Sequence, residues 1–559
     1  MKNTRRNAGD KAVKVFKQNS RMARFGGALG LLAIASTASA VEFSTGNPDL
    51  TIRWDNSIRY NLGARIEGRD ARIANNAGSD EGDFKFGEGS ITTNRLDLLS
   101  EVEVDWKQQM GFRVSGTAWG DHAYRDTHVR QNPALVGALS SYNNAEYSSH
   151  TKRYYRGLSG ELLDAFAYFN TYVDDRPLGV RLGRHALYWG AALFTNGGVS
   201  FNQNPIDARK GVSSPGIEAR EVQLPLSQLS ASLQVTPTVS VAGQYFFDWE
   251  AIHSPEGGTF LAGSDATLKG PDRLGGAAAF PANSPELGPE HKSGNWGVNA
   301  KIMVPEMNGT TFGVYYRKFD EKNTPWVLRN PAAPLFYRAV YARDTKLVGV
   351  SMDTTVAGAS IGAEVSYRMD GSLLSQGFAL ANEGARGDTW HALVNAVYGL
   401  KSNALWDAGS ISAELTYDRL GKVTKNANLF NREGSALCPL GKFAGCATDD
   451  AWGFAMRFAP QWVQVWPSVD LTVPFFVSAG LKGNSPSTLG VYQGAMSYSI
   501  GAELDIQRKY NVALTVADSK AKIIPNGGTN VLGPTYTGNG SGWQTTDRRR
   551  VMLTFKTAF

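Results

Sequence analysis

The feature that most constrains this chain is a two-residue alternation of apolar and polar side chains that persists over long segments. Between residues 51 and 67, apolar side chains occupy alternate positions from Ile52 to Ile66, with Asn56 as the one exception, and the opposite set runs from Arg53 to Arg65. Successive side chains of a β-strand point to opposite faces. The segment therefore predicts a strand with one apolar face and one ionic face.

The length of the alternation separates two kinds of β protein. Strands of soluble sandwiches usually run about 5–6 residues, whereas a tilted strand that crosses a bilayer needs about 9–11. Here the longer pattern recurs, and short and long connections alternate between the segments, as in outer-membrane barrels. Eighteen strands are predicted, with sixteen as the alternative count, at 52–66, 91–106, 110–121, 162–173, 178–186, 228–236, 238–250, 295–304, 310–319, 344–354, 359–369, 389–400, 409–419, 451–459, 468–481, 494–506, 510–520 and 548–559.

The final segment supports closure of these strands into a barrel. Lipid offers no partners for backbone hydrogen bonds, so a membrane sheet must pair its last strand with its first. Leu553, Phe555 and Phe559 share one face of the last segment, and a terminal Phe after such a strand resembles the assembly signal of outer-membrane proteins. We predict an all-β fold, a transmembrane antiparallel β-barrel over residues 41–559. We expect a Gram-negative outer-membrane location, with membrane lipid and the barrel assembly machinery as partners.

Residues 1–40 read as a cleaved export signal. A basic region ends at Arg24, an apolar stretch follows, and Ala38 and Ala40 supply the small residues that a signal peptidase needs, so we predict cleavage after Ala40. The alternative, an uncleaved anchor helix, is disfavoured by the short apolar stretch. The whole chain has a formal net charge of +6, and residues 1–40 carry +7 of charge, so the remainder has +6 − 7 = −1. The high pI therefore gives no support for nucleic-acid binding.

Cysteine and tryptophan positions add two local expectations. Cys438 and Cys446 lie eight residues apart, and in an exported protein this spacing favours a local disulfide over a metal site. Several tryptophans fall at or near the ends of predicted strands, where interfacial girdles place them. They are Trp54, Trp106, Trp249, Trp296, Trp390 and Trp452.

Motifs of catalysis are not apparent. The chain shows no Gly-x-Ser-x-Gly elbow, phosphate loop or clustered zinc motif, and we expect no enzyme activity, cofactor or metal. His122 and His185 are interpreted as hydrogen-bonding residues rather than catalysts. The acidic row Glu101, Glu103 and Asp105 is interpreted as part of a wet barrel lumen that also carries basic rows.

The stretch 180–250 carries the most distinctive motifs. Gly183-Arg184-His185 is followed by Tyr188-Trp189-Gly190 and then by Asn204-Pro205-Ile206-Asp207. This order resembles the domain-of-unknown-function 1302 family of proteobacterial outer-membrane proteins, whose members show Gly-Arg-Gln, Asn-Trp-Gly and Asn-Pro-x-Asp. His185 and Tyr188 depart from the family pattern. The similarity extends more weakly over nearly the whole mature chain.

The resemblance implies a barrel associated with envelope trafficking of hydrophobic or lipid-like compounds. It also implies a carrier lipoprotein and a resistance-nodulation-division exporter as companions. No settled catalytic activity comes with the family.

The connection 187–227 is long enough to carry function or to fold inside the barrel. We hypothesise that it forms a lumenal plug whose side chains line a substrate passage, and the alternative is that these side chains brace the loop against the wall by hydrogen bonds. The candidate passage residues are Arg184, His185, Trp189, Asn204, Asp207, Arg209 and Arg220.

The sequence favours one function over two others. The first is a channel or transporter that moves a hydrophobic or amphipathic compound across the outer membrane. The second is a surface-binding or structural protein whose long loops, such as 251–294, face outward. An outer-membrane hydrolase has the least support, because no nucleophile and base stand together in the sequence.

Overall fold

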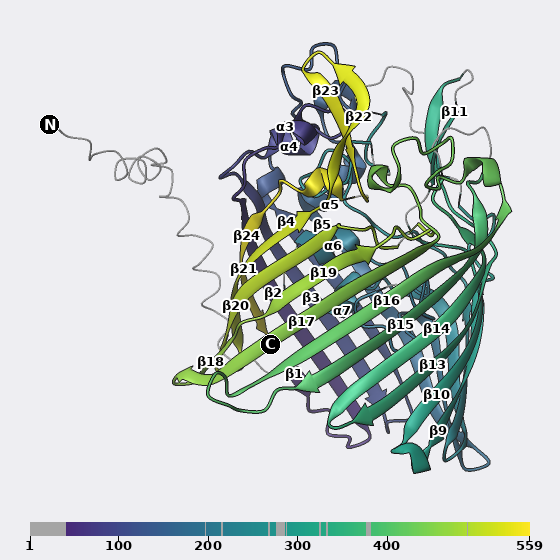
Figure 1. The fold of residues 1–559 in the computed structure, drawn as a ribbon. Coiled ribbons are helices and arrows are strands. Elements are labelled where there is room, and N and C mark those ends of the chain that lie inside the picture. The colour runs from purple at the N-terminus through teal and green to yellow at the C-terminus, as the bar shows by residue number, and fades with distance from the viewer. Residues whose placement is uncertain are drawn as a thin grey trace.

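The fold is a closed antiparallel β-barrel with loops gathered over one end (Figure 1). The computed structural model describes residues 41–559 except 196, 214–215, 267–268, 275–284, 287, 324–325, 331–333, 376–381, 489 and 541. The predicted signal peptide, with Ala38 and Ala40, lies outside the described residues.

Eighteen strand positions form the wall, because β18 and β19 are two pieces of one wall strand and β1 only extends the edge of β2. The wall strands are β2 (Leu50–Arg65), β3 (Ile91–Trp106), β4 (Met110–Asp121), β5 (Gly157–Val173), β6 (Arg176–His185), β7 (Leu226–Thr236), β8 (Val239–Phe246), β9 (Trp296–Val304), β10 (Thr310–Phe319), β13 (Thr345–Val356), β14 (Ala359–Ser372), β15 (Arg386–Gly399), β16 (Ala408–Lys425), β17 (Asp450–Trp466), β18 (Val469–Thr472), β19 (Phe475–Lys482), β20 (Met496–Ile506), β21 (Tyr510–Lys520) and β24 (Arg550–Ala558).

The barrel closes where the first wall strand meets the last. β2 pairs with β24 in a register that runs from Ser57 opposite Ala558 to Arg65 opposite Arg550. β2 also pairs with β3 on its other side, so it has a neighbour on each edge, as lipid burial demands. The short strand β1 (Val41–Phe43) pairs with the end of β2 that β24 does not reach.

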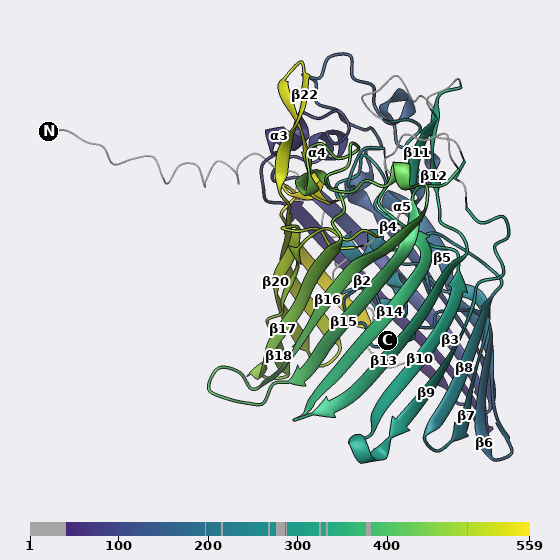
Figure 2. The same ribbon diagram turned by 45° about the vertical axis from the view of Figure 1, so that its right-hand side comes forward.

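The two ends of the barrel differ in the length of their connections. One end has tight turns: Asp174 and Asp175 have φ values of 49° and 61°, and Ala357 and Gly358 have 50° and 83°. Two consecutive positive φ angles fit the type I′ hairpin turn, whose twist matches that of the flanking strands. The other end carries long loops, which rise above the wall in Figures 1 and 2.

The long connections contain all the α-helices that the structure describes and two small hairpins. None of the described helices reaches the length and hydropathy that a membrane-crossing helix needs. The elements are α3 (Ala71–Ala74), α4 (Glu81–Lys85), α5 (Ser149–Tyr155), α6 (Ala208–Ser213), α7 (Ala219–Val222), the hairpin β11 (Trp326–Asn330) with β12 (Phe336–Val340), and the hairpin β22 (Ile523–Asn530) with β23 (Gly533–Gly538).

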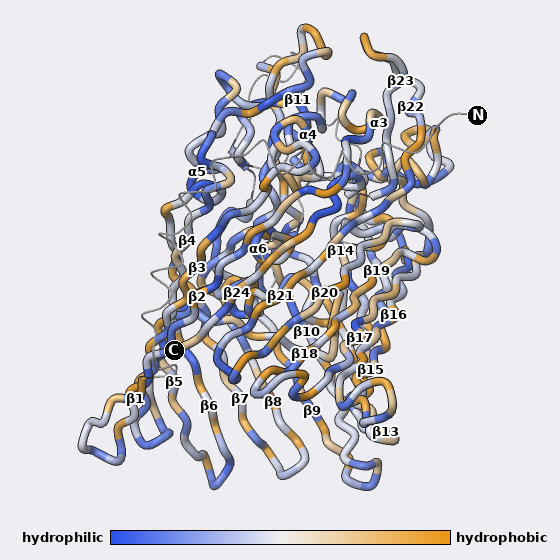
Figure 3. The backbone as a smooth tube through the Cα atoms, turned by 90° about the vertical axis from the view of Figure 1, so that its left-hand side faces the viewer, coloured by the Kyte–Doolittle hydropathy of each residue, from blue (hydrophilic) through white to orange (hydrophobic). Residues whose placement is uncertain are grey.

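Side-chain burial in the wall is the reverse of that in a soluble protein. On β3 the apolar Leu96 and Leu98 are 51% and 40% exposed, whereas Arg95 and Asp97 are 2% and 3% exposed. The apolar face therefore points outward and the charged face points into a filled interior, and Figure 3 shows hydrophobic and hydrophilic residues alternating along the strands. Exposed apolar area on this scale requires a lipid surround.

The predicted strands are right in number, and differences are confined to their ends and to one break. β16 extends to Lys425 and β17 to Trp466, beyond the predicted ends at 419 and 459. The predicted strand 468–481 is interrupted between β18 and β19. Pro474 lies in this break and has no N–H to offer to the sheet.

The predicted aromatic girdle holds for several strand ends but is wrong for Trp249. Trp390 is 47% exposed and its ring lies 4.6 Å from that of Tyr367 on the neighbouring strand. Trp249 lies beyond the end of β8, is 5% exposed and packs its ring 5.0 Å from Tyr341 of another loop. It therefore belongs to loop packing rather than to the interface with lipid.

Candidate functional site: a loop that crosses the barrel interior

The connection between β6 and β7, residues 186–225, is called the lumen loop here because it contacts inward-facing side chains around the wall. Two carboxylates bind its first part. Glu364 of β14 accepts backbone hydrogen bonds from Ala191 and Val199, the latter at 2.7 Å. Glu414 of β16 accepts from three consecutive N–H groups, those of residues 193–195, at 2.7, 3.2 and 2.8 Å. Hydrogen bonds to charged acceptors are the stronger kind.

Glycine makes this approach to Glu364 possible. A Cβ atom on Gly190 would lie 2.0 Å from one carboxylate oxygen of Glu364, and one on Gly198 would lie 2.1 Å from the other. Gly190 also has a φ of 87°, which side chains with a Cβ rarely adopt. The two glycines therefore leave the space in which the carboxylate reaches the backbone.

Three buried cations hold the turn that follows. Arg317 of β10 donates to the carbonyls of Val199 and Phe201 at 2.8 and 2.7 Å, Arg368 of β14 donates to the carbonyl of residue 197, and Lys322 donates to that of residue 202 at 3.0 Å. Among the described residues, no carboxylate lies within ion-pair distance of these three cations. Burial, with Arg317 nearby, lowers the pKa of Lys322, which lies beyond the end of β10, to about 7.

The second part of the lumen loop is held on the opposite side of the barrel by ion pairs. Glu221 of α7 pairs with Arg59 of β2 at 2.7 Å, and both side chains are almost fully buried. Glu218 pairs with Lys556 of β24 at 2.8 Å, and Lys210 of α6 pairs with Glu161 of β5. The loop is thus fixed to strands that lie on different sides of the lumen.

An apolar cluster fills the space between the loop and the β10–β13 wall. Its buried members come from the lumen loop and from the wall strands, and an aromatic pair, Trp189 with Tyr315, has ring centroids 6.3 Å apart. The buried residues of the cluster are Trp189, Val199, Phe201, Tyr315, Phe319 and Leu347.

The predicted passage residues on β6 point to opposite faces. His185 faces inward, is 1% exposed and shares hydrogen bonds with the Ser230 hydroxyl at 2.8 Å and a carbonyl at 3.0 Å. Arg184 lies on the same face as the exposed Leu182, and its nearest carboxylate is Glu250, at 3.8 Å. Arg184 therefore reaches the other candidates only indirectly, because Glu250 also contacts His253, which contacts Asp207.

The remaining candidates lie in the lumen loop and most are buried and bonded. Asn204 donates to the carbonyl of residue 187 at 2.6 Å, and the Trp189 N–H donates to the side chain of Gln203 at 2.9 Å. Arg220 keeps a side chain that is 34% exposed, between Glu101 at 2.8 Å and Glu218 at 2.7 Å. These contacts have the form of the bracing alternative, and the passage role stays a prediction.

Asp207 and Arg209 form a buried ion pair with His253 of the next long loop. Arg209 donates to both oxygens of Asp207, at 2.9 and 2.8 Å, and stacks over the Tyr154 ring at 3.9 Å. Burial opposes ionisation of Asp207, but Arg209 and His253 hold its pKa well below the usual range. Burial opposes protonation of His253, but its hydrogen bonds to Asp207 and Glu250 raise its pKa. The pair therefore joins two loops by charge.

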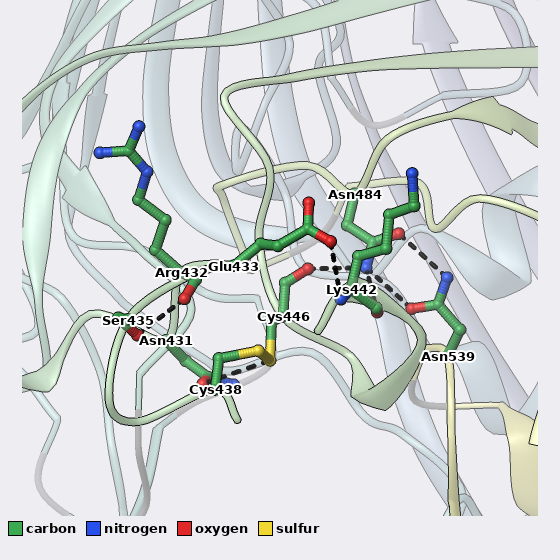
Figure 4. Close-up of a disulfide and its surroundings, with 9 residues drawn as sticks. All are labelled: Asn431, Arg432, Glu433, Ser435, Cys438, Lys442, Cys446, Asn484 and Asn539. Atoms are coloured by element: carbon green, nitrogen blue, oxygen red, sulfur yellow. Dashed lines mark hydrogen bonds between the residues drawn. A yellow bond between two sulfur atoms is a disulfide. The ribbon is translucent and has the colours of Figure 1, made fainter. Parts of the chain in front are cut away.

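Cys438 and Cys446 form a disulfide in the loop after β16, with Cα atoms 6.2 Å apart (Figure 4). Asn484 donates to the carbonyls of Lys442 and Cys446 at 2.8 and 2.7 Å, and exchanges hydrogen bonds with Asn539 at 2.8 and 3.0 Å. Both asparagines are fully buried. The disulfide loop is thereby tied to two further outer loops.

Sequence reasoning missed the wall residues that hold the lumen loop. Glu364, Arg368 and Glu414 all stand at inward positions of predicted strands, where a charged residue faces a lumen. Their inward position could have marked these residues as lumenal, but it does not indicate which loop each side chain will contact. The described residues contain no group of histidine, cysteine, aspartate or glutamate that could hold a metal ion.

Three solved structures resemble the chain at low similarity. Pseudomonas aeruginosa outer membrane protein OpdK has 10% identity and a TM-score of 0.39, covering 91% of this chain and 98% of its own. Acinetobacter baumannii OccAB1 has 10% identity and a TM-score of 0.41, covering 94% and 99%. The outer membrane channel DcaP of the same organism has 11% identity and a TM-score of 0.36, covering 93% and 100%.

No curated protein sequence matches the chain. One family model matches residues 21–559, nearly the full length, and its description is "Protein of unknown function (DUF1302)". The match includes the Trp189-Gly190 and Asn204-Pro205 motifs and all the wall strands. The chain therefore belongs to the DUF1302 family.

Proposed function

We propose that the protein is a channel of the Gram-negative outer membrane that passes a hydrophobic or amphipathic compound, with the lumen loop as its constriction. The observation that carries this proposal is the anchoring of one loop to strands on different sides of a closed barrel, by Glu364 and Glu414 on one side and by Arg59 on the other. A loop held in this way narrows the interior of the barrel.

The outer-membrane location is supported by the barrel itself. Its wall has no unpaired edge between β2 and β24, and its outward face is apolar. The barrel assembly machinery, a carrier lipoprotein and a resistance-nodulation-division exporter enter this proposal as expected partners. Within it, His185, Trp189, Asn204, Asp207, Arg209 and Arg220 act on passage by holding the lumen loop in place.

The test is a deletion in the lumen loop. Replacing residues 191–202 by a short glycine linker removes the part held by Glu364 and Glu414. We expect higher conductance in planar bilayers and faster entry of solutes into liposomes. A matched control replaces the outer tip of the β22–β23 hairpin, residues 526–532, in the same way. Unchanged conductance in the first variant, or an equal rise in both, would count against the constriction.

A further inference from the structure

A cavity lies between the tip of the lumen loop and one sector of the wall. Its lining includes Phe194 and Thr195 of the loop, and residues of β16, β17, β19 and β20. At the outer side it reaches Asn539 and Gly540 of the last long loop. The cavity therefore runs from the outer loops down to the loop tip.

The wall of this cavity carries small inward side chains. Ala455 of β17 pairs with Ser478 of β19, which in turn pairs with Ser497 of β20. Paired residues of neighbouring strands point to the same face, so three small side chains lie next to one another on the lumen side. They leave the space that larger inward side chains fill elsewhere in the barrel.

The described part of the lumen loop makes no polar contact with this sector. Among the residues that the structure describes, no hydrogen bond or ion pair joins the loop to β17, β18, β19, β20 or β21. The described rings of Phe194 and Phe476 of β19 do meet there, with centroids 5.7 Å apart. Separating the loop from the wall at this apolar contact breaks no hydrogen bond, so it takes less free energy than separation at the hydrogen-bonded anchors.

The charged groups in the cavity lining already have partners. The Glu414 carboxylate is occupied by the N–H groups of residues 193–195. Lys520 pairs with Glu67 at 2.9 Å and with Asp518 at 3.2 Å. The rest of the lining is aromatic, aliphatic, hydroxyl or amide. Such a surface suits a neutral molecule with apolar and hydroxyl parts better than an ion.

From these observations we infer that the solute passes the lumen loop along the β17, β19 and β20 wall, between Phe194 and Phe476, and that it is a neutral amphipathic compound. This inference rests on the proposed channel function and names its route and its selectivity residues. The half of the lumen loop that carries α6 and α7 is fixed by ion pairs and lies off the route.

Adjacent phenylalanines on β19 offer a matched pair of variants. Phe476 faces the cavity, whereas Phe475 points to the lipid side and is 40% exposed. Liposome swelling would compare butyl glucoside, which is neutral and amphipathic, with glucose and gluconate. We expect wild type to admit butyl glucoside fastest, Phe476→Ala to lose this preference severalfold, and Phe475→Ala to keep it.

A second experiment blocks the route instead of widening it. The two native cysteines are joined to each other, so Ser478→Cys introduces one free thiol, and a bulky neutral methanethiosulfonate reagent then fills the cavity. Ser232→Cys, at an exposed inward position of β7, is the control. We expect modification at 478 to slow butyl glucoside entry severalfold and modification at 232 to leave it unchanged.

The outcomes separate the route from the function. If wild type admits none of the three solutes, the proposed channel function fails. If wild type admits them but labelled Ser478→Cys and labelled Ser232→Cys behave alike, the route is wrong and the channel stands. If gluconate enters fastest, the inferred neutral class is wrong. Heat-modified electrophoretic mobility of each variant would show that its barrel is folded.

Discussion

The backbone N–H of Phe194 lies 3.2 Å from a carboxylate oxygen of Glu414. Leu193 and Thr195 donate to the same carboxylate, at 2.7 and 2.8 Å. One side chain of the wall thus positions the aromatic ring that meets Phe476. Because residue 414 lies on a rigid strand, the position of the loop tip is set by the barrel rather than by the loop alone.

Glu414→Gln tests this relationship. An amide has one acceptor oxygen and no charge, and a hydrogen bond to a charged group contributes about 1.5–3 kcal/mol. We expect the loop tip to leave its position more often, with at least about tenfold more open time, the ratio that 1.4 kcal/mol gives. Single-channel recording measures this. Glu306→Gln, in the turn after β9, is the control, and matching open times in the two variants would contradict the assignment.

Gly198→Ala tests the approach of Glu364 to the loop. The added methyl group would overlap the carboxylate, with a Cβ–oxygen distance of 2.1 Å, and overpacking of this kind costs about 1–3 kcal/mol. We expect faster protease cleavage within residues 191–199 while the barrel keeps its heat-modifiable mobility. Gly399→Ala, where a Cβ would meet nothing within 4 Å, should cleave like wild type. Equal protection of Gly198→Ala would show that the loop has room to shift.

Acidic side chains in the outer loops predict a pH-dependent packing of those loops. Burial raises the pKa of Asp80 to about 6 and of Glu81 to about 7, and it raises the pKa of Asp265 well above its usual range. Each carboxyl is harder to ionise in the packed loops than in loosened ones. Their stabilising contribution is therefore complete below pH about 4, the ordinary range of such groups, and is lost as pH rises through 6–7.

Hydrogen exchange of residues 78–83 and 140–142 at pH 5.5 and 8 measures this effect. We expect faster exchange at pH 8, beyond the chemical acceleration seen in an unstructured peptide. Glu81→Gln, which cannot ionise, should reduce the difference, whereas Glu88→Gln, at an exposed position, should retain it. Exchange that is slower at pH 8 than at pH 5.5 would reverse the assigned sign.

Removal of the disulfide should loosen the outer loops without weakening the wall. Cys438 and Cys446 are eight residues apart. In the chain-entropy model, a disulfide that closes so short a loop lowers the entropy of the unfolded loop and stabilises the folded one by about 2–3 kcal/mol. We expect the double Cys→Ser variant to speed hydrogen exchange at residues 484–493, which Asn484 connects to the disulfide loop. Asn484→Ala should speed exchange in the same segment with the disulfide intact. A lower unfolding temperature of the barrel, with unchanged loop exchange, would be the opposite result.

The wall was predictable because each strand carries its own signal. The alternation from Ile52 to Ile66 depends only on neighbours in sequence, and so do the turns at Asp174 and Ala357. The anchors of the lumen loop carry no such local signal. Glu364 meets residue 199 across a separation of 165 positions, and a glutamate on an inward face looks alike in the sequence whatever it binds.

The errors have local causes. Trp249 lies near the end of the predicted strand 238–250, but β8 ends at Phe246 and the ring packs against Tyr341 of another loop. The interruption between β18 and β19 falls at Pro474, a residue that signals a weak point in any strand. The alternation from Leu182 also places Arg184 on the outward face of β6, and its role in passage stays a prediction.

The short strand β1 continues the line of β24. Phe559 shares two backbone hydrogen bonds with Asn56, and Val41 lies opposite Trp54, so one position, opposite Asp55, separates them along that edge of β2. β24 and β1 therefore lie end to end along β2. In a chain that starts at Val41, as the predicted cleavage gives, Phe559 could be joined to Val41 through one added residue and new termini opened between Asp174 and Asp175. The permuted polypeptide should fold into the same barrel.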